Sequence, residues 1–187
     1  VRCRVRTVTV PLNRPLEQAW AMLDEGVLPE LSRAVWNANG LRLGLLTAAE
    51  AGDFGRALGP ADGFADQSLV AINRPTVLRS SPPLRAEFVA DLTRPPGPRH
   101  VETFTGHQAR LLITARPATG GAALEITPQH YAPRSSLLAR DPLDKLLDGR
   151  VFEELAAQVV VPPGMALVLG YSLPQSLRPP LPVEPEP

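Results

Sequence analysis

The sequence has three histidines, the side chains best suited to acid–base or metal chemistry, and one of them stands near a carboxylate. His100 and Glu102 are two positions apart, so a strand would place both on one face, and His107 could approach them across a turn. Imidazole and carboxylate groups in that arrangement could bind a metal ion or exchange protons. The polar run from Thr103 to Gln108 favours an ordinary strand edge instead, and no spacing links His130 to the other two histidines.

Recognised motifs for covalent catalysis and nucleotide binding are missing from the sequence. It contains no G-x-S-x-G nucleophile elbow, no Walker loop and no G-x-G-x-x-G turn. Arginines flank Cys3 and could activate its thiol, yet a terminal strand of alternating residues is more typical of a scaffold. Asp62–Asp66 is similar to an acidic calcium loop but lacks the distal ligands, which favours a solvated turn. We therefore expect a protein that is not an enzyme, with no catalytic, cofactor-binding or metal-binding residue.

The composition excludes several classes of protein. The chain has 187 residues, which is enough for one generous domain or two small ones. Its single cysteine excludes a disulfide within the chain, and 19 basic residues balance 19 acidic ones. The neutral balance argues against nucleic-acid binding, which would need the arginines near Cys3 to join a larger basic face.

The apolar stretches are too interrupted to predict a membrane-spanning helix. The longest, Leu155 to Leu169, contains Gln158 and the turn Pro162–Gly164. No signal peptide is visible in the chain, and its start at Val1 rather than methionine is expected of a processed product or an excised piece.

Residues 1–60 predict an N-terminal α+β unit. Val1–Val10 alternates as a strand does, with a phase slip near Thr7 that predicts a bulge. A short helix is expected from Asn13, and a strand is expected over Leu41–Leu46. Leu16, Trp20 and Leu23 are expected on the apolar face of the first helix.

Two further helices are expected in the same unit. One follows Pro29, has Leu31, Val35 and Trp36 on its apolar side, and stops at Asn39-Gly40. The other begins at Thr47, where Thr47 and Glu50 have the spacing of a capping box, and ends by Gly59-Pro60. A loop is then expected over Gly59–Asp66.

Residues 61–172 predict a mainly antiparallel β region. Thr119–Gly121 is expected to connect a hairpin, and another hairpin is expected around Pro162–Gly164. Asp141–Leu155 predicts one or two short helices in an insertion near 141–156, whose acidic residues face Arg140, Lys145 and Arg150 on a charged helix face. The expected strands are Gln67–Ile72, Thr76–Arg79, Leu84–Leu92, His100–Thr105, Ala109–Arg116, Ala122–Gln129, Gln158–Val161 and Ala166–Tyr171.

Residues 173–187 contain six prolines and predict a proline-rich tail or linker. The fold class expected for the whole chain is α+β, with a small N-terminal helical layer packed on a predominantly antiparallel β-sheet.

Two β-rich stretches carry a resemblance to a known family. Ala109–Pro128 resembles the core hairpin of bacterial secretins, in which L-x-V-x-P, a glycine turn and V-x-L-x-I-x-P follow one another. Val159–Gly170 looks like the secretin segment that ends in G-x-x-x-V-I/L-G. Ala19–Glu25 and Asn39–Leu46 look like parts of uncharacterised exported bacterial proteins that carry such a hairpin.

The resemblance implies an extracytoplasmic or periplasmic, non-catalytic structural or interaction module of a bacterial envelope assembly. Pore formation is not implied, because the secretin lip and gate signature is absent after Gly170. We expect protein partners or self-association through an exposed sheet edge, offered by the hairpin Ala109–Gln129. The alternative is a soluble ligand-binding domain or hydrolase, with His100 or His130 in a cleft between helices and sheet.

Overall fold

The computed structural model describes residues 2–10, 16–60, 63–70, 74–79, 87–93, 100–105, 108–132 and 147–171. The helical elements are α1 (Glu17–Trp20), η1 (Glu25–Val27), α2 (Glu30–Ala38), α3 (Ala51–Leu58) and η2 (Glu153–Leu155). The strands are β1 (Arg2–Thr9), β2 (Leu41–Thr47), β3 (Gly63–Val70), β4 (Thr76–Arg79), β5 (Glu87–Asp91), β6 (Val101–Thr105), β7 (Gln108–Ala118), β8 (Gly121–Tyr131), β9 (Arg150–Val151), β10 (Ala157–Val161) and β11 (Met165–Tyr171).

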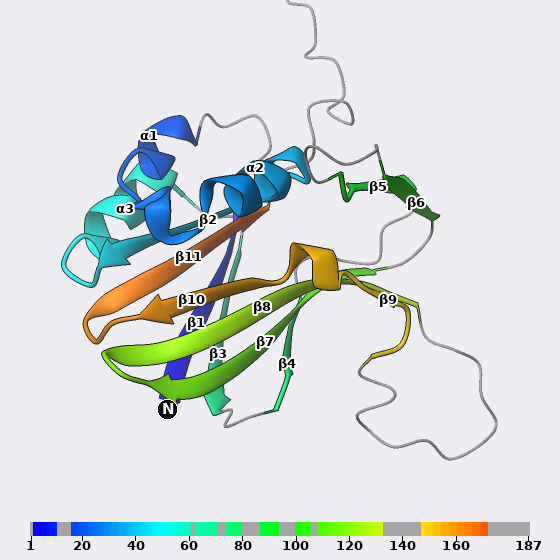
Figure 1. Cartoon of the computed structure of the whole chain (residues 1–187). Helices are drawn as coiled ribbons and strands as arrows, with labels where there is room; N and C mark the ends of the chain where they lie inside the picture. Colours follow the sequence, from blue (N-terminus) through cyan, green and yellow to red (C-terminus); the bar gives the residue numbers. More distant parts are fainter. Residues whose placement is uncertain are drawn as a thin grey trace, which may run out of the picture.

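The strands pair antiparallel in one large sheet and three two-stranded ones. The large sheet has the order β10-β8-β7-β4, with β9 also paired to β8. The pairs are β1–β3, β2–β11 and β5–β6. Figure 1 shows α1 and α3 beside β2 and β11, with the large sheet on the other side. The predicted α+β class, with helices packed on antiparallel sheet, is confirmed.

The main core lies between the β2–β11 pair and the large sheet. Leu43 from β2 meets Ile113 from β7 and Ile126 from β8, and Trp36 of α2 closes one end. A second apolar cluster joins α1 and α3 to β2 through Trp20, Leu23, Leu46 and Phe54. Because both faces of β2 are covered, its residues Leu43–Leu46 are buried in succession, and the strand has no wet face.

The N-terminal strand is confirmed, but the predicted bulge near Thr7 is wrong. The pairing of β1 with β3 runs without interruption from Arg2 opposite Val70 to Thr9 opposite Gly63. Continuous pairing holds the backbone in register where the apolar alternation slips.

The first helix is shorter than predicted, since α1 begins at Glu17 and the expected cap residues lie outside the described part of the chain.

The second helix is confirmed with one exception on its apolar side. Val35 and Trp36 are buried, and α2 ends at Ala38 before Asn39 and Gly40, where Gly40 has φ of 70°. Leu31, predicted to share that side, is 66% exposed, because it lies in the first turn, away from the core contacts of the second half.

The hydrogen bonds of the predicted capping box form, but the third helix does not begin at Thr47 as predicted: Thr47 ends β2, and α3 begins at Ala51 after Glu50 in the cap position. The backbone N–H of Glu50 donates to the Thr47 hydroxyl (3.3 Å), while the Glu50 carboxylate accepts from the Thr47 backbone N–H (2.9 Å) and hydroxyl (2.7 Å). These hydrogen bonds, led by that from the side chain of Thr47, lower the pKa of Glu50. The helix itself, α3, ends at Leu58, before Gly59 and Pro60 as predicted.

Every strand predicted beyond residue 60 overlaps a strand of the structure: Thr76–Arg79 matches β4 in both bounds, and the bounds of the others are shifted. β3 begins at Gly63, so the second half of the loop predicted over Gly59–Asp66 is wrong. The β7–β8 hairpin is confirmed, with Gly120 at φ of 83° in its turn.

The hairpin predicted around Pro162–Gly164 is wrong, although both of its strands exist. β10 pairs with β8 and β11 pairs with β2, so the two neighbours in sequence belong to different sheets. Contacts with the helical layer direct β11 away from β10: a Cβ on Gly170 would lie 2.1 Å from Cζ2 of Trp20. This close approach leaves room only for glycine.

The predicted insertion lies partly, and the predicted tail wholly, outside the described residues. Residues 141–146 and 172–187 lie outside the described residues, as does residue 140. Arg150 belongs to strand β9 and not to a charged helix face, and η2 is a single turn. The predicted units 1–60 and 61–172 share the strand pairs β1–β3 and β2–β11, and their division into domains stays a prediction.

Candidate functional site

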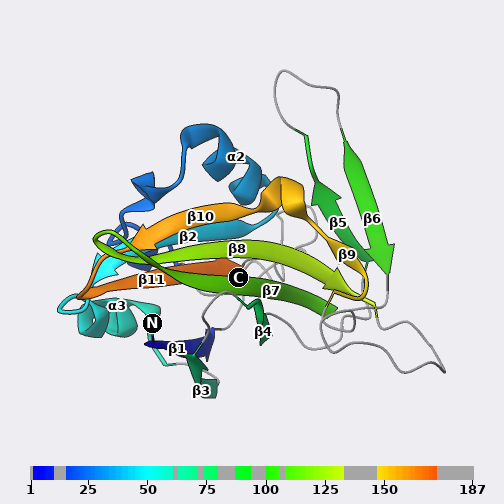
Figure 2. The same cartoon turned by 60° about the horizontal axis from the view of Figure 1, so that its bottom comes forward.

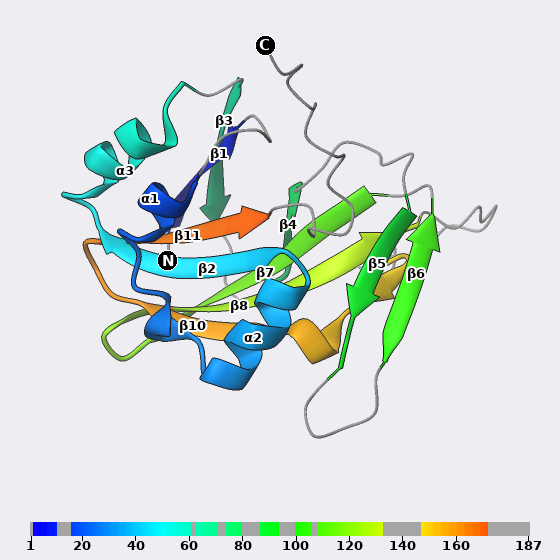
Figure 3. The ribbon, with the colours of Figure 1, turned by 90° about the horizontal axis from the view of Figure 1, so that it is seen from above.

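The β5–β6 ribbon lies at the outside of the molecule. Figures 2 and 3 both show β6 as its outermost strand, with β5 between β6 and the other described strands. Within the part of the chain that the structure describes, β6 pairs with β5 alone. One edge of β6 therefore carries no neighbouring strand among the described residues.

The pairing register shows which backbone groups of β6 face that edge. Asp91 stands opposite Val101, and the Leu92 N–H donates to the His100 carbonyl at 2.8 Å. In an antiparallel ladder, hydrogen-bonded and non-hydrogen-bonded pairs alternate. The backbone groups of Glu102 and Phe104 therefore point toward β5, while those of Val101 and Thr103, and of Thr105 by the same alternation, point outward.

The side chains of β6 alternate between solvent and the rest of the molecule. Val101 is 37% exposed and Thr103 is exposed, whereas Glu102 and Phe104 are half-buried against the other elements. The strand thus has a wet face, with the side chains of Val101 and Thr103, and an anchored face, with those of Glu102 and Phe104. Its outward backbone groups belong to the residues of the wet face.

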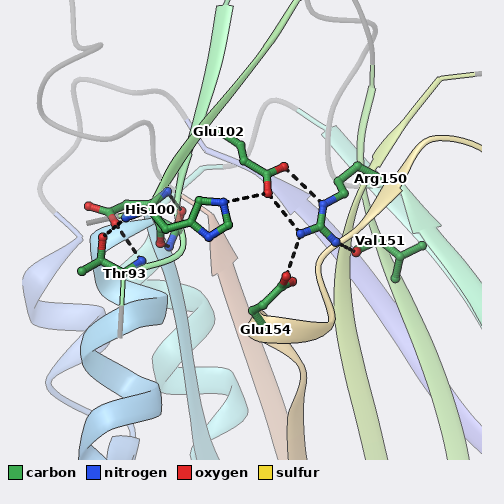
Figure 4. A network of polar contacts seen from close by, with 8 residues as sticks. Thr93, His100, Glu102, Arg150, Val151 and Glu154 are labelled. Carbon is green, nitrogen blue, oxygen red and sulfur yellow. Dashed lines mark hydrogen bonds and ion pairs between the residues drawn. The ribbon is translucent and has the colours of Figure 1, made fainter. Parts of the chain in front are cut away.

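Arg150 of β9 anchors the ribbon through Glu102 of β6 and also binds Glu154 of η2 (Figure 4). Its Nε donates to one oxygen of Glu102 (3.2 Å), and its Nη2 donates to the other (3.1 Å) and to Glu154 (2.7 Å). Its Nη1 donates to the carbonyl of Val151 at 2.6 Å. This two-pronged contact fixes both the position and the orientation of the Glu102 carboxylate.

The charges in this network shift two pKa values in the directions that preserve the ion pairs. Hydrogen bonds to Glu102 and then Glu154 raise the pKa of Arg150. Burial favours the neutral form of Glu154, but the hydrogen bond and charge of Arg150, a backbone hydrogen bond and the nearby His100 together lower its pKa. The charged forms of Arg150 and Glu154 are therefore favoured over their neutral forms.

Aromatic rings form the layer beneath the network. The Phe104 ring centroid lies 4.5 Å from that of His130 and 5.4 Å, edge to face, from that of Phe152. The Arg150 guanidinium lies 5.2 Å from the Phe152 ring. Phe152 is buried together with Val35, Leu92 and Leu155, so apolar contacts from α2, η2 and the ribbon meet here.

Asn39, which follows α2, holds β5 by its side-chain amide. Its Nδ2 donates to the carbonyl of Asp91 (2.7 Å), and its Oδ1 accepts from the backbone N–H of Asp91 (2.8 Å). Asn39 is 2% exposed and also donates to the Val35 carbonyl. A buried amide that satisfies both backbone groups of one residue makes a firm tie between helix and ribbon.

The structure brings together only part of the predicted histidine cluster. Nε2 of His100 lies 3.3 Å from Oε1 of Glu102, as their spacing predicts. His130 is buried beneath Phe104, and His107 lies outside the described residues. Among the residues that are described, no three His, Cys, Asp or Glu side chains form a metal-binding group. The side chain of Cys3 and the whole of residue 62 are outside the description.

Two anchoring residues, Asn39 and Arg150, have functions that the sequence did not reveal. Asn39 meets a residue 52 positions away, and Arg150 meets Glu102 48 positions away. The sequence marks Asn39 only as a helix stop and Arg150 only as one charge of a mixed cluster. The i,i+4 spacing of Arg150 and Glu154 is the one local signal, and that pair does form.

The hairpin predicted to offer a free edge is largely enclosed. β8 has β7 on one side and β9 and β10 on the other, while β4 covers residues Arg110–Ile113 of β7. β4 pairs with Arg110–Ile113 of β7 alone, so no described strand pairs with the outer side of Thr114–Ala118.

The uncovered part of β7 is a poor edge for strand addition. The Phe152 N–H donates to the carbonyl of Pro128, so the backbone of Pro128 points away from β7. By the alternation of the ladder, Ala115 and Pro117 then face the outer side of β7. Pro117 lacks an N–H, and Ala115, the other residue whose backbone faces outward, is only 3% exposed, so neither offers a partner an accessible donor.

An open cleft of about 320 Å³ lies on the outer face of β7 and β8. Its lining includes Thr114, Glu125, Thr127 and Glu153 but neither His100 nor His130. Residues of β7 and β8 that alternate with the lining, such as Ile113 and Ile126, enter the main core. The cleft is thus on the sheet face that turns away from that core, beside η2, and α1, α2 and α3 contribute no residue to its lining.

The helices in the described part of the chain are all too short or too polar to cross a membrane. Comparisons with protein-family models, with curated proteins and with solved structures find no match to this chain. The site is therefore interpreted from its own geometry.

Proposed function

We propose that this chain is a non-catalytic protein-interaction module of a bacterial envelope assembly, similar to secretins, and that it binds a partner strand along β6. The observation that carries the proposal is the outer edge of β6, where the backbone groups of Val101 and Thr103 point away from β5. Unpaired backbone donors and acceptors at a sheet edge are a template for an added strand.

The anchors of the ribbon support this function because they hold β6 in place before a partner arrives. Asn39 fixes Asp91 of β5, and Arg150 fixes Glu102 of β6. A strand that is already ordered loses little conformational entropy on binding, so more of the hydrogen-bond energy contributes to affinity.

The placement of the secretin-like stretches supports separate roles for the large sheet and for the β5–β6 ribbon. Ala109–Pro128 contributes β7 and β8, and Val159–Gly170 contributes to β10 and β11. These strands enclose the main core. They would serve as the scaffold of the module, while the ribbon outside them meets the partner in an extracytoplasmic or periplasmic setting.

The proposal is tested by isothermal titration calorimetry, in which a synthetic peptide of alternating threonine and valine is added to the dilute protein and the heat of binding is measured. Thr103→Pro removes the outward N–H without removing a donor to β5, and an edge strand tolerates such a proline. We expect Thr103→Pro to abolish binding of the peptide. The matched variant Thr103→Val keeps the N–H and the β-branched shape, and should bind as the wild type does.

Two results would overturn the proposal. One is the absence of any peptide binding by the folded wild-type protein. The other is equal binding by the wild type and by a Thr103→Pro variant whose circular dichroism spectrum is unchanged, because binding would then use a different surface.

A further inference from the structure

The outer edge of β6 is complementary to itself. Resting on the proposed function, we propose that the partner strand is β6 of a second copy of this chain. The two strands would run antiparallel about a two-fold axis that passes beside Thr103. The two β5–β6 ribbons would then form one four-stranded antiparallel sheet.

The register of this pairing uses the outward backbone groups of both copies. With Thr103 opposite Thr103, Val101 of each copy stands opposite Thr105 of the other. All three residues have outward backbone groups by the alternation of the β5–β6 ladder. Each would donate to and accept from the other copy, so no outward group between Val101 and Thr105 is left without a partner.

The side chains that meet across the two-fold axis are compatible. On the wet face, the exposed β-branched side chain of Thr103 meets its own copy, and β-branched pairs favour antiparallel pairing. On the anchored face, Glu102 stands opposite Phe104, so two carboxylates never face each other directly. Glu102 already has Arg150 as its counter-charge within its own chain, so pairing adds no uncompensated charge.

The edge lacks three of the features that keep strands apart. Val101–Thr105 contains no proline and no lysine, and its pairing with β5 contains no bulge. Both strands are the same length, so self-pairing leaves no overhang. In Figures 2 and 3 the other described strands lie on the β5 side of β6, away from the edge that the second copy would approach.

The contact is small, which sets the expected behaviour. A single strand pair buries less surface than the roughly 1,200–2,000 Å² of a stable protein complex. The dimer should therefore form reversibly, and its fraction should rise with protein concentration.

Opposite charges at Thr103 test the two-fold pairing directly by sedimentation velocity over a wide concentration range. Thr103→Lys would place two lysines opposite each other, and Thr103→Glu would place two carboxylates opposite each other, so each variant alone should remain monomeric. An equimolar mixture of the two variants should dimerise at least as well as the wild type. Because Thr103 is exposed, both substitutions should preserve the fold. Thr119→Lys, at the exposed turn of the β7–β8 hairpin, is the matched control and should dimerise normally.

The outcomes separate this inference from the proposed function. A wild-type protein that stays monomeric throughout, yet binds the threonine–valine peptide, overturns self-pairing and leaves strand addition standing. A monomer that also fails to bind the peptide overturns both. Dimers that persist in Thr103→Lys alone, or a mixture that gains nothing over the single variants, place self-association elsewhere and overturn the inference.

Discussion

β6 and the end of β7 are both uncovered edges of antiparallel sheets among the described residues, yet they differ in what they offer. On β6, the outward backbone groups belong to Val101 and Thr103, which both carry an N–H. On β7 they belong to Ala115 and Pro117, and the proline removes a donor. Only alternate residues of an edge strand direct their N–H and C=O groups outward. Whether an edge can pair with another strand therefore depends on every second residue.

The same two regions differ in how they are attached. β7 is held by apolar burial: Ile113 is 4% and Ala115 is 3% exposed. The ribbon has a smaller apolar contact through Phe104 and depends on polar ties from Asn39 and Arg150. Polar ties fix orientation, and their loss should affect the ribbon more than the main core.

Of the substitutions that test this difference, Asn39→Ala should lower the free energy of unfolding most. It removes the amide that bonds both backbone groups of Asp91, which should lower the free energy of unfolding by about 2 kcal/mol. Amide exchange should quicken in β5 and β6 more than in β7 and β8. Chemical denaturation measures the first effect and exchange the second. Asn37→Ala, at an exposed position of the same helix, should change little; equal losses for the two variants would contradict the account.

Arg150→Met should cause the next largest loss of stability. It keeps the length of the side chain but leaves Glu102 and Glu154 without their shared cation, and the half-exposed setting limits the loss to about 1 kcal/mol. Arg56→Met breaks a pair with Asp53 that is exposed on both sides, so it should be nearly neutral. Denaturant midpoints compare the two variants, and a smaller loss for Arg150→Met than for Arg56→Met would refute the anchoring role.

The pH dependence of stability should follow from Glu154. Its folded-state pKa is lowered, so its ionised form stabilises the protein at neutral pH, and this contribution disappears as the pH falls through the folded-state pKa. Glu154→Gln should therefore be less stable than the wild type at pH 7, with the difference shrinking in acid. Thermal unfolding at a series of pH values measures the difference, and a gap that widens in acid would reverse the assigned sign.

Pro117→Ala should have the smallest effect and sharpen the comparison most. It restores an outward N–H on β7 at an exposed position, so stability should change by less than about 0.5 kcal/mol. The variant should bind the threonine–valine peptide along β7 even when β6 carries Thr103→Pro. A Thr103→Pro, Pro117→Ala double variant that still binds no peptide would show that proline alone does not close this edge.

Local patterns in the sequence predicted most strands because alternation and turn residues act over a few positions. Thr76–Arg79 and the turn at Gly120 are examples, as is the capping box of Thr47 and Glu50. Burial of Leu31 was predicted wrongly because helical spacing shows which residues share a side but not which turns of that side meet the core.

Pairing between distant strands could not be read from local patterns. Pro162–Gly164 has the residues of a hairpin turn, but contacts of β11 with β2 and Trp20 place the two flanking strands in different sheets. The candidate site was hidden for the same reason. His100 and Glu102 were placed together by their spacing, whereas Arg150 and Asn39 reach the ribbon only in the folded chain.

Residue-by-residue amide hydrogen exchange of the dilute protein, with and without the threonine–valine peptide, tests the central claim most directly. We expect slow exchange at Glu102 and Phe104, fast exchange at Val101 and Thr103, and slower exchange of the latter two amides when the peptide is added. Strong protection of Val101 and Thr103 in the dilute protein alone, equal to that of Glu102 and Phe104, would contradict the claim.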